Sequence, residues 1–305
     1  MSTDSSRGPE EPVKLRVYQN FLHANTTQYE ALNTVNIQTV ICDETGVTRG
    51  AVNAVKGTNK PLGCSVGLHP KDQTISAIAI SNSGNRCLVV EFTTQLGLRA
   101  TGRRGSRTAF DLVRAMIEDV LCLPTSFYAF DLAPLALALY RELNIRITDG
   151  VDIQSAFPGS RKTSLEAILA IIGDDAGIRV DKDHIISAFE DLSYDPKLSS
   201  NRTALIQRAW ISQFIAGYEN APEQFDATRH IDTTTKTFSN EKLDILSKWA
   251  ADSVRLQYMK PLETEHTVMV GPGSNEAGGF HARSVVYKNR LRPDKPLECP
   301  TQSTE

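Results

Sequence analysis

Short hydrophobic runs separated by polar and turn-forming residues in the first third of the chain are typical of β-strands. Three short runs rich in β-branched residues, at 39–42, 74–80 and 86–92, are each bounded by turn-forming residues. The Ser-Asn-Ser-Gly-Asn sequence at 81–85 predicts a hairpin loop between the second and third runs. The stretch 46–73 contains Gly and Lys and shows no such pattern, so we interpret it as an insertion.

From residue 109 onward the period of the pattern becomes helical. In 109–121 the apolar positions that share one helical face are Phe110, Val113, Met116, Ile117 and Val120. The pattern then predicts a strand at 127–131, a helix at 134–143 and a final strand region spanning 145–148 and 151–153.

Further helices follow in the second half of the chain. Thr163 and Glu166 have the spacing of a capping box, which predicts a helix over 165–172 that ends at Gly173. Two more helices are predicted near 203–215 and 239–259.

This order of elements predicts an α/β fold. Three consecutive strands indicate an antiparallel meander, and the helices and strands that alternate after it indicate parallel strands joined by crossover helices. We therefore expect one mixed sheet flanked by helices in a single domain over 13–270. Residues 1–12 and the basic tail 271–305 have low-complexity composition, and we expect both to be disordered.

Composition excludes several classes of protein. The 33 basic and 36 acidic residues give a net charge of −3, so no global positive field exists to drive nucleic-acid binding. The longest apolar run, 132–140, is too short to cross a bilayer, and the first dozen residues do not resemble a signal peptide. We therefore expect no membrane partner. Five scattered cysteines without zinc-site spacing indicate a reducing compartment, cytoplasmic or nuclear.

One segment carries a resemblance to a known family. Residues 127–157 contain Phe130-Asp131, Leu139-Tyr140, Asn144-Ile145 and Asp152-Ile153-Gln154 at the spacings of the second motif of DEDD-superfamily 3′–5′ exonucleases. The segment is most similar to the Egalitarian-type and Werner-type branches. Residues 36–46 resemble the first motif of the family and residues 249–256 the third. The likeness covers 27–262 and implies an RNase H-like fold, in agreement with the predicted order of elements.

The resemblance implies phosphodiester hydrolysis by two divalent cations, Mg²⁺ or Mn²⁺, which need several carboxylates at one edge of the sheet. In an active enzyme the candidates for metal ligands are Asp43, Glu44, Asp131 and Asp252. Because alternate residues of a strand share a face, the family separates its two first-motif acids by one residue. Asp43 and Glu44 have no such spacer, so either Asp43 is in place and Thr45 holds the second position, or Glu44 is in place beside Cys42.

The other two motifs also depart from the family pattern. Leu135 stands at the catalytic Asp position of the second motif, Phe130 replaces its His, and Asp131 matches a non-catalytic position. In the third motif Trp249 and Asp252 lie three residues apart instead of four. We therefore regard these four acids as vestigial, expect no intact catalytic or metal site, and predict a pseudo-exonuclease without a cofactor.

Binding is the function that we expect to remain. Arg99, Arg103, Arg104 and Arg107 cluster in a Gly-containing loop after the third predicted strand, where arginine side chains suit the phosphates of RNA or another single-stranded nucleic acid. An equally ordinary role for this loop is solubility or contact with an acidic partner protein. Two alternatives stay open: an active 3′–5′ exonuclease that uses the four acids, and a scaffold that binds only proteins.

Overall fold

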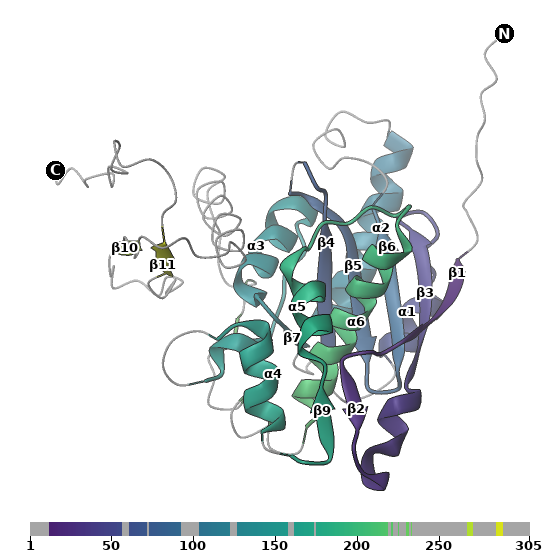
Figure 1. Cartoon of the computed structure of the whole chain (residues 1–305). Helices are drawn as coiled ribbons and strands as arrows, with labels where there is room; N and C mark the ends of the chain where they lie inside the picture. Colours follow the sequence, from purple (N-terminus) through teal and green to yellow (C-terminus); the bar gives the residue numbers. More distant parts are fainter. Residues whose placement is uncertain are drawn as a thin grey trace. The chain divides into compact units, whose positions relative to one another are not determined.

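The computed structural model describes residues 12–56, 61–71, 73–92, 104–122, 127–157, 162–173 and 175–218, isolated positions between 221 and 233, and two short strands at 267–270 and 285–288. Within these residues, the centre of the fold is a seven-stranded mixed sheet with the order β1-β3-β6-β5-β4-β7-β8 (Figure 1). Its strands are β1 Val13–Tyr18, β3 Asn36–Asp43, β4 Leu62–Leu68, β5 Ile75–Asn82, β6 Arg86–Glu91, β7 Phe127–Ala129 and β8 Gly150–Asp152. The predicted α/β class with a mixed sheet is confirmed.

Five of the seven strands run in one direction. β3 is parallel to β6, and β4, β7 and β8 are parallel to one another. β5 runs antiparallel to both β4 and β6, and β1 runs antiparallel to β3. The carboxyl ends of β3, β6, β4, β7 and β8 therefore meet at one edge of the sheet, which we call the carboxyl edge.

The meander exists, but it consists of different strands from those predicted. The antiparallel order is β4-β5-β6, and β3 lies outside it as a parallel neighbour of β6. The stretch 46–73 is therefore no insertion, because it contains helix α1 (Arg49–Lys56) and the central strand β4. The sequence of β4, Leu-Gly-Cys-Ser-Val-Gly-Leu, is rich in small residues and holds one β-branched residue, so its strand signal is weak.

One face of the sheet is covered by α1, α2 (Arg104–Leu121) and α3 (Leu132–Leu143). These helices and the inward-facing side chains of the strands form an apolar core that includes Leu62, Cys64 and Val66 from β4. The predicted helices at 109–121 and 134–143 are confirmed, and α2 begins earlier than its apolar pattern because charged residues form its first turn.

The opposite face is covered by α6 (Ser199–Ala216), which confirms the helix predicted near 203–215 (Figure 1). The helix lies very close to β4 because Gly63 has no side chain: a Cβ at Gly63 would stand 2.0 Å from the carbonyl oxygen of Ala209. Burial on all sides explains why α6 has no polar face, since Leu205, Trp210 and Ile211 are all buried.

Smaller elements complete the first unit of the chain, Met1–Ala251. They are β2 (Leu22–Ala24), which pairs with β9 (Ile178–Val180), two 3₁₀ helices at Thr27–Thr34 and Ile153–Ser155, α4 (Ser164–Ile172) and α5 (Lys182–Glu190). The predicted capping box of α4 is confirmed, since Thr163 Oγ1 accepts from the Glu166 N–H and the Glu166 carboxylate accepts from the Thr163 N–H. Of the predicted final strand region, 150–152 forms β8 and 145–148 has no regular structure.

The second unit spans Asp252–Glu305. Its described residues are the antiparallel pair β10 (Thr267–Val270) and β11 (Val285–Lys288), and β11 falls within the range predicted as a tail. The predicted helix at 239–259 and the terminal segment 1–11 lie outside the described residues, so the domain boundaries remain predictions.

Candidate functional site

Asp43, the first of the candidate acids, ends β3 at the carboxyl edge. Its Oδ1 accepts hydrogen bonds from the N–H of Thr45 at 2.9 Å, the hydroxyl of Thr45 at 2.8 Å and the N–H of Gly46 at 2.6 Å. This carboxylate therefore stabilises the turn that follows β3. The next residue, Glu44, is largely buried.

Asp131, the acid of the second motif, precedes helix α3 and is buried. It adopts a left-handed backbone conformation with φ of 53°, and its N–H donates to Gln154 Oε1 at 2.7 Å. The neighbouring Asp152 is also buried, and its Oδ2 accepts from the Ser155 hydroxyl at 2.6 Å. These contacts join β7, β8 and the start of α3, so the hydrogen bond between Asp131 and Gln154 stabilises the turn between β7 and α3.

The candidate acids do not converge. Strands β6, β5 and β4 lie between β3, which carries Asp43, and β7, which leads to Asp131. At a spacing of about 4.8 Å per strand, four steps place the two acids roughly 19 Å apart. Two-metal sites need cations about 3.5–4 Å apart, so Asp43, Glu44 and Asp131 do not fit a shared metal pair. In the part of the chain that the structure describes, no three His, Cys, Asp or Glu side chains gather as metal ligands, and Asp252 lies outside that part.

The fold also changes where the first motif should be sought. The predicted first motif belonged to the first strand of the meander, and that strand is β4, whereas Asp43 lies on β3. The carboxyl half of β4 and the following residue read Ser65-Val66-Gly67-Leu68-His69. No carboxylate stands in this half of the strand, so the central position of the carboxyl edge contributes no acid.

A buried arginine of α6 occupies the face of β4 beside this position. The Arg208 guanidinium donates from Nε to Ser65 Oγ at 3.0 Å and from Nη2 to the Val66 carbonyl oxygen at 3.0 Å. Its Nη1 donates to the carbonyl oxygens of Ala188 at 2.7 Å and Asp191 at 3.3 Å. Arg208 is 2% exposed, so the space between α6 and β4 holds a positive charge.

Tyr194, Glu91 and Arg202 form a hydrogen-bonded cluster at the carboxyl end of β4. Tyr194 packs against Gly67, where a Cβ would lie 2.5 Å from the Tyr194 Cβ, and the Tyr194 hydroxyl donates to Glu91 on β6. Arg202 donates to both Glu91 oxygens, from Nε at 2.8 Å and from Nη2 at 3.1 Å. Burial and the Glu91 charge raise the pKa of Tyr194, and the hydrogen bond to Glu91 raises that of Arg202.

Backbone pairing completes this closure. The Leu68 N–H donates to the Leu192 carbonyl oxygen at 2.8 Å, and the Tyr194 N–H donates to the Leu68 carbonyl oxygen at 2.7 Å. Leu135, which was predicted to stand at the catalytic Asp position of the second motif, is buried in the apolar core. Glu91, Tyr194 and Arg208 were not predicted from the sequence; the available signal was an arginine within the apolar run of α6.

The predicted arginine loop is partly helical. Arg104 is the first residue of α2 and Arg107 lies in its first turn. Arg99 and Arg103 lie outside the described residues. The contacts that these arginines were predicted to make with nucleic acid remain a prediction.

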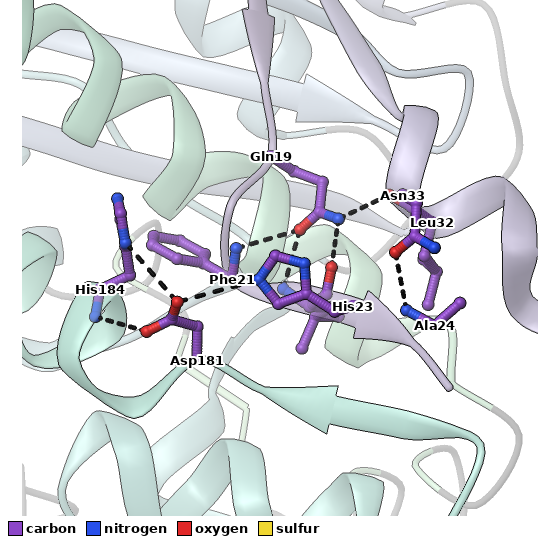
Figure 2. A network of polar contacts seen from close by, with 9 residues as sticks. Gln19, Phe21, His23, Ala24, Leu32, Asn33, Asp181 and His184 are labelled. Atoms are coloured by element: carbon purple, nitrogen blue, oxygen red, sulfur yellow. Dashed lines mark hydrogen bonds and ion pairs between the residues drawn. The ribbon is translucent and has the colours of Figure 1, made fainter. Parts of the chain in front are cut away.

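Two histidines flank one carboxylate where β2 meets α5, as Figure 2 shows. Asp181 caps α5 by accepting from the His184 N–H at 3.1 Å, and its Oδ2 lies 3.8 Å from both His23 Nε2 and His184 Nδ1. The backbone hydrogen bond is the largest cause that lowers the pKa of Asp181. The Gln19 side chain beside it ties the backbone of Phe21, Leu22 and Leu32 together, so this region holds the N-terminal segment to the domain.

The cysteines are free thiols within the described residues, in agreement with the sequence. Cys42, Cys64 and Cys87 are buried, and Cys122 is partly exposed, with its thiol 3.1 Å from the Arg146 carbonyl oxygen. Burial raises the pKa of both Cys42 and Cys64 to about 12. These thiols are therefore protonated and unreactive at neutral pH.

No family model and no curated protein matches the chain. Among solved structures, RNase D of Trypanosoma brucei bound to GMP is 14% identical with a TM-score of 0.40, and the match covers 74% of this chain and 66% of that one. The complex of the same enzyme with RNA U12 is 15% identical with a TM-score of 0.40, and covers 74% and 73%. The EXD2 exonuclease domain, soaked in Mg and GMP, is 14% identical with a TM-score of 0.29, and covers 66% and 98%.

These three structures, of an RNase D and of an exonuclease domain, match the chain at low identity and low TM-scores. Among the described residues, no helix has the length and apolar character needed to span a bilayer. The resemblance of the chain to the DEDD superfamily therefore still depends on its sequence motifs and on the order of its elements.

Proposed function

We propose that this chain is a catalytically inactive 3′–5′ exonuclease-like protein that binds RNA or another single-stranded nucleic acid. The observation that carries the proposal is the contact between Arg208 and the carboxyl half of β4. A family member would use acids of this strand to hold cations, whereas here Ser65 and the Val66 carbonyl oxygen accept hydrogen bonds from a buried guanidinium.

Electrostatics supports the loss of hydrolysis. Divalent cations require several anionic oxygens, and a fixed positive charge close to the site repels them in a medium of low dielectric constant. The nearest acid across the sheet, Glu91, is held in a bidentate ion pair by Arg202 and accepts from Tyr194. Arg202 and Tyr194 therefore donate to the Glu91 lone pairs that a metal ion would need.

The binding function is proposed for the arginines at 99, 103, 104 and 107. Each arginine that neutralises a phosphate of a single strand releases condensed counterions, so affinity falls with salt. Four such contacts give an expected slope of about −3 for log K against log salt concentration.

A combined assay tests both parts of the proposal. Purified protein is mixed with 3′-labelled and 5′-labelled single-stranded RNA and DNA in the presence of Mg²⁺ or Mn²⁺, and both shortening and fluorescence anisotropy are followed. We expect no shortening, together with salt-sensitive binding that a fourfold Arg→Ala variant at 99, 103, 104 and 107 reduces strongly. The matched control carries alanine at the exposed cations Lys71, Arg179, Lys182 and Lys197.

Two outcomes contradict the proposal. Shortening from the 3′ end that is lost in Asp43→Ala supports the active exonuclease that uses Asp43, Glu44, Asp131 and Asp252 with Mg²⁺ or Mn²⁺. Absence of any salt-sensitive binding to RNA or DNA, combined with recovery of a specific partner protein, supports the protein-only scaffold.

A further inference from the structure

The first strand of the sheet, β1, has an open edge within the described part of the chain. It lies at one end of the sheet, and its six residues pair with β3 on one side only (Figure 1). Edge strands of this kind present unpaired backbone N–H and C=O groups that can pair with another chain.

The register shows which backbone groups point outward. The Gln19 N–H donates to the Val35 carbonyl oxygen, which continues the β1–β3 ladder. Because alternate residues of an antiparallel strand bond to the same neighbour, Val13, Leu15 and Val17 face β3 with their backbone groups, and Lys14, Arg16 and Tyr18 face outward. The Tyr18 carbonyl oxygen already accepts from Gln207 Nε2 at 2.8 Å, so the edge is open at Lys14 and Arg16.

The side chains of β1 divide into an apolar face and a basic face. Val13 is 54% exposed and Leu15 is 36% exposed, on the face that α6 covers only at Val17. On the opposite face Arg16 lies in one row with Gln38 of β3 and Arg86 of β6, and all three are exposed.

The cations on this face lack acidic partners. Among the described residues, no ion pair involves Lys14, Arg16 or Arg86. Within the described residues, two cations of β1 and one of β6, the next strand but one, therefore have no acidic partner, on a chain whose net charge is −3.

We propose that β1 is a docking edge for an extended segment of a partner protein in which acidic and apolar residues alternate. Such a segment adds a strand to β1 through backbone hydrogen bonds at Lys14 and Arg16. Its acidic side chains then lie opposite Lys14 and Arg16, and its apolar side chains cover Val13 and Leu15.

A second copy of this chain fits the edge less well. If β1 paired along its whole length with β1 of a second copy and kept the apolar face continuous, Lys14 would lie opposite Arg16, or Arg16 opposite Arg16 of the other copy. Like charges directly opposite each other destabilise a strand pair. A nucleic acid strand would satisfy the cations, but it would leave the exposed valine and leucine without contacts.

Fluorescence anisotropy with a labelled, end-blocked peptide of four Glu-Val repeats tests the proposal on the full chain. We expect saturable binding that is lost with a Lys-Val peptide, with a peptide of the same composition in two blocks, and with one N-methylated at alternate amides. The double variant Lys14→Glu/Arg16→Glu should weaken binding by about tenfold, because two exposed attractions become repulsions. Lys71→Glu/Lys197→Glu, with the same change in net charge away from β1, should bind as the parent does.

Several results would overturn the proposal. Equal binding of the N-methylated or block peptide excludes strand addition and leaves only a charge effect. If a labelled oligothymidylate binds in a way that depends on Lys14 and Arg16, and the Glu-Val peptide does not bind, this face is assigned to nucleic acid. Concentration-dependent dimerisation in sedimentation velocity that the double variant changes assigns the edge to a second copy. Since the peptide controls use the unaltered protein, a folding defect of a variant cannot decide the result.

Discussion

Replacing Arg208 with methionine should destabilise the fold strongly, because this guanidinium joins α6 to β4 and to the end of α5. It donates four hydrogen bonds, to Ser65 Oγ and to the carbonyl oxygens of Val66, Ala188 and Asp191. At about 1 kcal/mol for each bond, their loss costs about 4 kcal/mol. Removal of a buried charge offsets part of this cost, so we expect a loss of about 2–4 kcal/mol in the free energy of unfolding.

Urea unfolding followed by circular dichroism measures this loss directly, with the slope m expected to stay unchanged. For a domain of this size the melting temperature should fall by about 4–16 °C. Arg179→Met is the matched control, because Arg179 is exposed on β9 and an exposed substitution changes the free energy of unfolding by about 0.5 kcal/mol or less.

Arg208→Lys separates charge from shape. A lysine keeps the positive charge, but its single nitrogen cannot reach four acceptors that surround a planar group. We therefore expect most of the stability loss to remain in Arg208→Lys. A loss under about 1 kcal/mol in Arg208→Met, or full stability in Arg208→Lys, would refute the view that the guanidinium fork holds this junction.

Two further predictions concern the packing of α6 and the cap of α5. Gly63→Ala should lower the free energy of unfolding by about 3 kcal/mol or more, because the new Cβ lies 2.0 Å from a backbone oxygen of α6. Gly50→Ala in α1, where the nearest atom is 3.8 Å from the new Cβ, should raise it by about 0.5–1 kcal/mol. The midpoints of urea unfolding compare the two variants. Asp181 has a pKa below its ordinary value of 3.8, so its contribution to stability is complete above that pH and disappears as the pH falls through the lowered pKa. In acid titrations Asp181→Asn, which keeps the helix cap, should flatten the stability curve below about pH 4, and a curve as steep as that of the parent would contradict this assignment.

The order of elements could be predicted wherever local chemistry is strong. The strands that end at Asp43, Asn82 and Glu91 are rich in β-branched residues, and α4 begins at its capping box. The central strand β4 could not be predicted in this way. Its small residues are required by α6, which approaches within backbone contact at Gly63, and this requirement weakens the local strand signal.

The candidate site shows the same division. The sequence placed Leu135 at the catalytic Asp position of the second motif, which stays a prediction, and the structure shows that this leucine is buried. The strand β4 was not recognised from the sequence, and for that reason the strand of Asp43, a residue regarded as vestigial, was placed first in the meander. Its position on β3, with three strands between it and β7, follows only from the pairing of β4 with both β5 and β7.

The sequence by itself determined the α/β class and the helices that follow β6, because periodicity is a local property. Only the tertiary structure decided which strand lies at the centre, that Arg208 occupies the face of β4, and that β1 forms an open edge with a basic and an apolar side. These features depend on contacts between residues far apart in the chain, and no local pattern of residues records which distant partner a strand or a side chain will meet.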